Sequence, residues 1–192
     1  MALVARHRRD VTADEFFAMA DRLPPTAQLI DGEVVVVISP SIRHQLVVGE
    51  LYHRLRLWIA EAPGRGVCGI PVDVKLDDRN VYAPDLWWCS EAHAPDRSEI
   101  RLPAVPDLAV EVLSPSTRRY DLGAKRARYE QLGLPELWVV DPRPGARVAV
   151  HVLRRSAADT PTFDVDIAIG ADGAVTSPQL DGFSLAVTEL LA

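Results

Sequence analysis

One acidic residue inside a very apolar segment constrains the fold of this chain most. Residues 107–113 read Asp-Leu-Ala-Val-Glu-Val-Leu, so Glu111 lies between two valines in a stretch too apolar to form an exposed sheet edge. An ionised glutamate in a buried strand is costly unless it is paired or bound to a cation. A neutral carboxyl with a raised pKa, or a salt bridge to Arg118 or Arg119, would also meet this requirement.

The first third of the chain predicts a short helix, a hairpin and a long helix. Thr12 and Glu15 form a capping-box pattern that opens the short helix. Asp31-Gly32 predicts a tight hairpin turn between two apolar segments. Ser41 is the expected N-cap of a helix over about residues 42–60. The residues expected to form the buried stripe of that helix are Val48, Leu51, Leu55 and Trp58.

The rest of the chain predicts strands around one further helix, which Gly133 and Pro135 should end. Short loops favour antiparallel pairing of the three strands that precede this helix. Residues 163–167 alternate apolar and acidic side chains, which predicts a strand with one solvent-exposed face. The elements expected after residue 62 are strands at about 67–76, 82–90 and 107–113, a helix from 117 or 119 to 132, a strand at 136–141, strands at 147–153 and 163–167, and a short helix at 188–191.

Length and composition predict one globular domain over residues 1–192, with its core at about 29–154 and C-terminal strands at about 147–185. The composition is 48% hydrophobic and 25% charged, which excludes a disordered or collagen-like chain. No apolar run approaches the roughly 20 residues that a membrane span needs, and the N-terminus lacks a secretory pattern, so we expect a cytoplasmic protein. Cys68 and Cys89 stand alone, which indicates buried cysteines rather than a zinc site or a disulfide framework.

The charge distribution gives two opposite indications about nucleic acid. A net charge of −6 and a pI near 5.3 count against it as a partner. Basic residues nevertheless cluster between 118 and 128, and Arg6, Arg8 and Arg9 form a basic arm. Arg118, Arg119 and Arg126 are the candidate nucleic-acid contacts. A solvated helix face is the competing interpretation of the cluster.

A second carboxylate, Asp85, is the expected companion of Glu111. Asp107 shares a strand face with Glu111 but lies about 13 Å away along the strand, too far to bind the same ion. An acid on a neighbouring strand can come much closer, and Asp85 lies one strand earlier. Oxygen ligands without histidine or cysteine indicate a hard divalent ion, Mg²⁺ or Mn²⁺.

Lys125 is the candidate basic residue of the site. Of the 21 lysines and arginines in the chain, only Lys75 and Lys125 are lysines, so a compact cation at position 125 is unusual for this protein. Asp121, Lys125 and Tyr129 are spaced i, i+4, i+8 and should share one side of the helix. An ordinary i, i+4 ion pair is the alternative role for Asp121 and Lys125.

The order helix, three strands, helix, strand, with Pro84-Asp85 on one strand and Glu111 on the next, resembles the PD-(D/E)XK nuclease superfamily. Within it, residues 12–155 resemble the Uma-type restriction endonuclease family. The matching motifs are Leu29-Ile30-Asp31-Gly32-Glu33, Ser39-Pro40, His44, Pro84-Asp85, the run from Pro106 to Thr117, Asp121, Lys125, Tyr129, and Trp138-Val139-Val140-Asp141-Pro142. The resemblance implies an α/β fold with a restriction-endonuclease-like core of helix, three antiparallel strands, helix and strand. An N-terminal helix-hairpin and a C-terminal β meander would be added to this core.

The resemblance and the spaced residues together imply a metal-dependent endonuclease that hydrolyses DNA phosphodiester bonds. Asp85, Glu111 and the main-chain carbonyl of Val112 would hold Mg²⁺ or Mn²⁺, and Lys125 would orient the attacking water or stabilise the transition state. His44, Asp121 and Tyr129 are possible supporting residues, although a core histidine is the alternative for His44. A homodimer is expected because symmetric cleavage of a duplex needs two sites.

Two positions depart from the family pattern. The usual lysine two residues after the strand acid is replaced by Leu113, which the resemblance accommodates if the lysine has moved to Lys125. Asp73-Val74-Lys75 spells the Asp-x-Lys tripeptide one strand too early and is a rival. Gln28 stands where the family often carries an acid, which either removes a ligand or alters a surface pair.

Two other functions remain open from the sequence. A catalytically silent nuclease-like module that binds nucleic acid or a protein partner fits the acidic charge equally well. A carboxylate-based glycosidase is disfavoured, because an aromatic-rich sugar platform is not evident beyond Trp87, Trp88 and Trp138. The residues do not indicate a target sequence.

Overall fold

The computed structural model describes residues 5–6, 10–36, 40–114, 118 and 121–192. Its helical elements are α1 (Ala13–Ala18), the 3₁₀ helices η1 (Ala20–Arg22) and η2 (Glu91–His93), the long α2 (Ile42–Glu61), the π-helix η3 (Asp121–Lys125), α4 (Arg126–Gln131) and α5 (Val187–Leu190). The capping box at Thr12 and the Ser41 cap form as predicted. Within the described part of the chain, no helix is long and apolar enough to cross a membrane.

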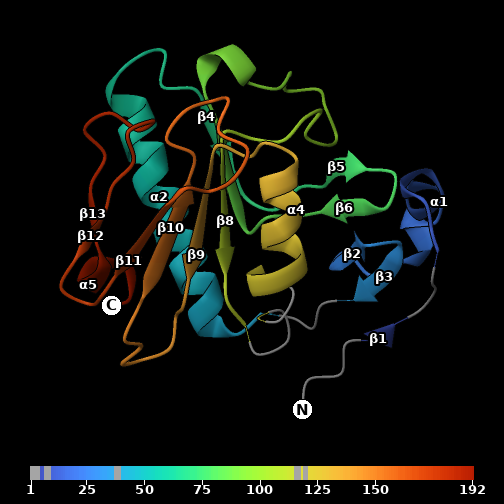
Figure 1. Ribbon diagram of the computed structural model, residues 1–192, viewed down its shortest axis with the longest axis horizontal. Coiled ribbons are helices and arrows are strands. Elements are labelled where there is room, and N and C mark those ends of the chain that lie inside the picture. Colours follow the sequence, from blue (N-terminus) through green and yellow to red (C-terminus); the bar gives the residue numbers. More distant parts are fainter. Residues whose placement is uncertain (1–4, 7–9, 37–39, 115–117, 119–120) are drawn as a thin grey trace.

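The larger sheet has six strands in the order β11-β10-β9-β8-β7-β4 (Figure 1). Its strands are β4 (Val67–Gly69), β7 (Leu86–Cys89), β8 (Leu108–Val112), β9 (Glu136–Val140), β10 (Val150–Arg154) and β11 (Val165–Ile169). Strands β4, β7 and β8 pair antiparallel as predicted, and β8 pairs parallel with β9. The segment that contains η3 and α4 makes the crossover that a parallel pair requires.

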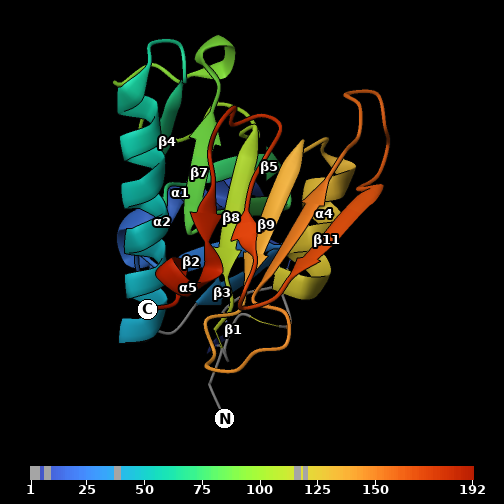
Figure 2. The same ribbon diagram turned by 90° about the vertical axis from the view of Figure 1, so that its left-hand side faces the viewer.

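Helical segments cover both faces of this sheet, with α2 on one side and α4 on the other (Figure 2). The predicted stripe of α2 is buried and packs into one apolar cluster with Leu86, Val110 and Val140. The opposite cluster combines Ala109 and Val139 of the sheet with residues of the second sheet. All five residues of β8 are buried, so Glu111 lies in the core as its apolar neighbours predicted.

A second sheet, which the sequence did not reveal, lies beside α4. Its order is β1-β3-β2-β6-β5. Its strands are β1 (Ala5–Arg6), β2 (Ala27–Ile30), β3 (Glu33–Val36), β5 (Val74–Asp77) and β6 (Asn80–Tyr82). The Asp31-Gly32 turn has φ values of 51° and 76°, which suit a tight hairpin with two left-handed residues.

The predicted strand at 67–76 was wrong, because it divides between the two sheets. β4 ends at Gly69 and β5 begins at Val74, with Pro71 in the break. Proline removes a backbone donor, which explains why pairing with β7 does not continue. The segment 82–90 is divided in the same way, since Tyr82 ends β6 and belongs to the second sheet.

The C-terminal meander differs in part from its prediction. β10 and β11 pair antiparallel, but β11 begins two residues later than predicted. Ile167 is 42% exposed, so the expected buried face of this edge strand is not formed. A separate two-stranded sheet of β12 (Ala174–Val175) and β13 (Leu185–Ala186) then leads into α5.

Candidate active site

Strand register brings the two predicted carboxylates to one level of the larger sheet. Leu86 pairs with Val110, and Asp85 directly precedes Leu86, so Asp85 lies next to Glu111 across β7 and β8. The Val112 amide donates to Asp85 Oδ2 at 2.7 Å. The Asp85 carboxylate is therefore fixed at the end of β8, close to where the Glu111 side chain projects.

Glu111 is bonded through both carboxylate oxygens to the helical segment that follows β8. Lys125 Nζ lies 2.9 Å from Oε2, and the Tyr129 hydroxyl donates to Oε1 at 3.1 Å. Asp121 Oδ1 lies 3.3 Å from the same ammonium. All four side chains are buried, with Glu111 and Lys125 each only 2% exposed. The predicted i, i+4, i+8 face is thus the face that contacts Glu111.

A π-helical turn holds this arrangement. Asp121 and Lys125 are the ends of η3, and α4 continues from Arg126. Short π-helical turns are rare and occur frequently at functional sites. The sequence predicted an ordinary α-helix here, because the local spacing of residues does not distinguish the two helical forms.

Burial and the neighbouring charges change the pKa values of Glu111 and Lys125 in different ways. Burial raises the pKa of Glu111 to about 8; Lys125 opposes this shift, whereas Asp121 and Asp85 add to it. Burial alone would lower the pKa of Lys125, but the surrounding carboxylates outweigh it and the pKa is raised. Lys125 therefore stays protonated beside the carboxyl groups of Glu111 and Asp121.

His44 contacts the site from the first turn of α2. Its Nε2 atom lies 3.2 Å from Asp85 Oδ2, and the imidazole is buried. Burial would lower the pKa of His44, but the hydrogen bond and charge of Asp85 raise it overall. His44 therefore lies at the carboxylate pair rather than only within the apolar core.

A cavity of about 130 Å³ opens beside these groups. Its polar lining includes Gln28, His44, Asp85, Glu111, Ser114 and Lys125. Since a water occupies about 30 Å³ in the liquid, this space suits an ion with part of its hydration shell. Two buried atoms of the lining, Gln28 Oε1 and His44 Nδ1, have no hydrogen-bond partner within the described chain. Such atoms are costly in a dry interior and indicate a place where a ligand or water binds.

The donor set fits a magnesium-type ion better than a zinc-type ion. No group of three or more His, Cys, Asp or Glu side chains in the described ranges is arranged to hold a metal. Mg²⁺ is typically bound by one or two carboxylates and retains several waters. Asp85 and Glu111 provide the two carboxylates, and the cavity beside them provides space for the waters.

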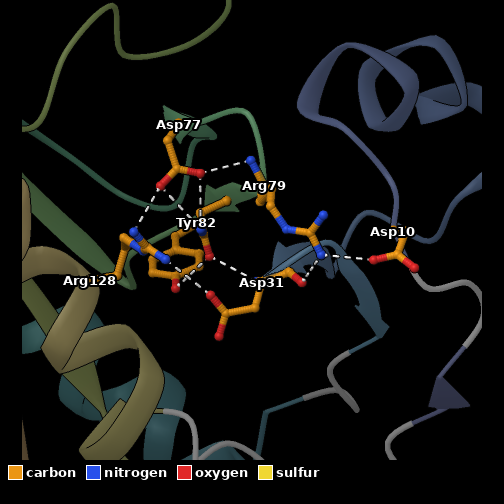
Figure 3. Close-up of polar contacts among 7 residues, drawn as sticks. Asp10, Asp31, Asp77, Arg79, Tyr82 and Arg128 are labelled. Atoms are coloured by element: carbon orange, nitrogen blue, oxygen red, sulfur yellow. Dashed lines mark hydrogen bonds and ion pairs between the residues drawn. The ribbon is translucent and has the colours of Figure 1, made fainter.

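Polar contacts fasten the second sheet to the helix that carries Tyr129 (Figure 3). Arg128 lies 3.2 Å from Asp31 Oδ1 in the β2–β3 turn and 3.4 Å from Asp77 Oδ2 of β5. Asn80 accepts from the Asp31 amide and from the Tyr82 hydroxyl. The Tyr82 ring meets the Tyr129 ring edge-on at 5.5 Å. These contacts hold the second sheet against α4, and residues Ala27 and Gln28 of β2 line the cavity.

Other candidates lie away from the cavity. Lys75 of the rival Asp-x-Lys tripeptide is in the second sheet, where it pairs with Asp14 and Asp78 near the surface. Leu113 is part of the apolar core. Asp107, which directly precedes β8, accepts a hydrogen bond from the Ser90 amide and lies away from the cavity, in agreement with its predicted distance from Glu111.

The predicted nucleic-acid contacts are only partly described. Arg118 does not pair with Glu111, because it lies 3.0 Å from Asp141 Oδ2, which corrects that alternative. Arg126 is half-buried. Arg119 lies outside the described residues. Gln28, by contrast, lines the cavity instead of making a surface pair, and Ser114 joins it there without having been predicted.

Protonation of Asp141 is expected to lower the stability of the folded protein at acid pH. Arg143 and Arg118 lower its pKa to about 2, below its unfolded value. The stabilisation is therefore present above the unfolded pKa and is lost as pH falls towards about 2. Asp141→Asn should cost on the order of 1 kcal/mol at neutral pH, because these are ion pairs with partly exposed arginines. Urea unfolding should show that the difference in free energy of unfolding between wild type and Asp141→Asn is smaller at about pH 3 than at neutral pH. A difference that is the same at both pH values would contradict the prediction.

Comparisons with known proteins agree with this architecture. The model of the family Uma2, described as "Putative restriction endonuclease", matches residues 13–188. Among solved structures, the chain is similar to "a putative nuclease belonging to DUF820" from Anabaena variabilis. The TM-score is 0.74 and the sequence identity is 18%, over 94% of this chain and 97% of that one. No curated protein matches the sequence. The structural match confirms the predicted α/β fold class.

Proposed function

This chain belongs to the Uma2 family, and from that membership and the buried site we propose that it is a nuclease that uses Mg²⁺ or Mn²⁺ to hydrolyse phosphodiester bonds in DNA. The observation that carries the proposal is Glu111, which is buried on a core strand and lines a cavity together with Asp85 and Lys125. Three ionisable groups around an open cavity are expensive for stability, which is typical of a catalytic site.

The cation would be held by the carboxylates of Asp85 and Glu111 and by the main-chain carbonyl of Val112. When bound, the ion would supply Lewis-acid activation of water and neutralise charge that develops on the phosphate. Within the chain, Tyr129 and Lys125 orient one Glu111 oxygen each, and His44 with the Val112 amide orients Asp85.

Lys125 serves as a fixed positive charge and not as a general base. Its raised pKa keeps the ammonium protonated, so it can donate to a water or to a phosphate oxygen in the cavity that it lines. Asp121, whose Oδ1 lies 3.3 Å from the ammonium, compensates part of this charge. DNA is the proposed substrate and a homodimer the proposed assembly, since duplex cleavage needs a site for each strand.

A direct test measures Mn²⁺ binding and DNA cleavage by the wild-type protein. Calorimetry should show Mn²⁺ binding, and Mn²⁺-soaked crystals should show anomalous density between Asp85 and Glu111. Supercoiled, linear duplex and single-stranded DNA should be compared with and without EDTA, and cleavage should disappear with EDTA. Binding of DNA without Mn²⁺ binding or cleavage would overturn the proposal and favour a catalytically silent module.

A further inference from the structure

We propose that Gln28 contributes a third protein oxygen to the cation site, through its side-chain carbonyl Oε1. This inference rests on the proposed function and assigns one more ligand to that site. It starts from a combination that is uncommon in a folded protein: a glutamine side chain that is buried, lines the cavity beside Glu111 and has an oxygen without a hydrogen-bond partner among the described residues.

The position of Gln28 in β2 directs it towards the site. Ala27 and Leu29 pack into a small apolar cluster with α1. Because strand side chains alternate, Gln28 shares the opposite face with Ile30, which packs in the cluster that contains Tyr129. Gln28 is only 8% exposed and lines the same cavity as Asp85 and Glu111.

The backbone of the strand that carries Gln28 is held on both sides. β2 is paired on one side with β3 and on the other with β6. The Arg128 contact with Asp31 attaches the end of β2 to α4, which carries Tyr129 (Figure 3). A fixed ligand of this kind lowers the entropy cost of ion binding.

A carboxamide oxygen suits this site chemically. Glutamine carbonyls are ordinary ligands for hard cations that prefer oxygen. A third carboxylate would add negative charge to a cavity that Asp85 and Glu111 already line. Gln28 instead offers an oxygen donor without a charge.

The test compares metal affinity with thermal stability in Gln28→Leu. This substitution keeps the approximate volume and removes an oxygen for which the described part of the chain provides no hydrogen-bond partner. We expect the Mn²⁺ dissociation constant to rise by roughly 10-fold or more, while the melting temperature without metal stays the same or increases. Gln28→Glu should restore or strengthen Mn²⁺ binding, because it keeps an oxygen and adds a charge.

Gln179→Leu is the matched control. The Gln179 amide donates to the Asp107 carbonyl at 3.2 Å, far along β8 from Glu111, so its loss should lower the melting temperature and leave Mn²⁺ affinity unchanged. If Gln28→Leu lowers stability and binds Mn²⁺ like wild type, Gln28 is a structural residue and the inference is wrong. If the wild type itself binds no Mn²⁺, the proposed function fails as well. If the wild type binds Mn²⁺ and Gln28→Leu binds it equally tightly, only this inference fails.

Discussion

Glu111→Gln is expected to reduce DNA cleavage by at least about 10²- to 10³-fold, the scale measured when a group that stabilises transition-state charge is removed. The amide keeps the shape and an acceptor for Tyr129, but it removes the negative charge that would hold the cation. Mn²⁺ affinity should fall in parallel. Single-turnover cleavage with saturating Mg²⁺, together with Mn²⁺ calorimetry, measures both effects.

Glu136→Gln is the control for this experiment. Glu136 is also buried on a central strand, but it pairs with Leu108 at the start of β8 and bonds to Trp138 and Ser177. Its substitution should affect stability and leave cleavage within a few-fold of wild type. Equal losses of cleavage in both variants would indicate that any buried glutamate of this sheet supports folding, and would remove the catalytic assignment of Glu111.

Lys125→Met is expected to cause the largest loss of stability, about 3–5 kcal/mol, the range for breaking a buried ion pair by removing one partner. Methionine fills the space of the lysine stem but leaves Glu111 and Asp121 without their cation. Glu111 would then be buried neutral, with its pKa raised further. A raised folded pKa makes stability fall as pH rises from the unfolded to the folded pKa, and in the wild type this fall ends near the Glu111 pKa of about 8. In the variant the fall continues to higher pH, so the deficit should be larger at about pH 9 than at about pH 7.

Urea unfolding of Lys125→Met, Glu111→Gln and the double variant tests the pairing directly. The double variant should be less destabilised than the sum of the single changes, because its carboxamide needs no cation and still accepts from Tyr129. Additive losses would show that Lys125 stabilises the fold through contacts other than Glu111.

Several features of the fold could be predicted because they depend on residues close together in the chain. Thr12 with Glu15, Ser41 and Asp31-Gly32 form the caps and the turn that their side chains and backbone preferences favour. The apolar surroundings of Glu111 similarly required a buried strand with an unusual acid. Its pairing with Asp85 followed from the order of the strands.

The remaining features depend on contacts between residues distant in sequence, whose energies the local pattern does not contain. The break between β4 and β5 and the second sheet arise from pairings such as Leu29 with Val81. That sheet decides that Gln28 lines a cavity instead of lying at the surface.

Because its flanking residues are apolar, Glu111 could be predicted to be buried and to need a partner for its carboxyl group. Its actual partners, Lys125 and Tyr129, follow from contacts made in the folded core, where Arg118 pairs with Asp141 instead. The choice between an arginine and a lysine depends on how the π-helical turn packs against the sheet. That packing is a balance of burial and pairing over the whole core, which no single segment of the chain specifies.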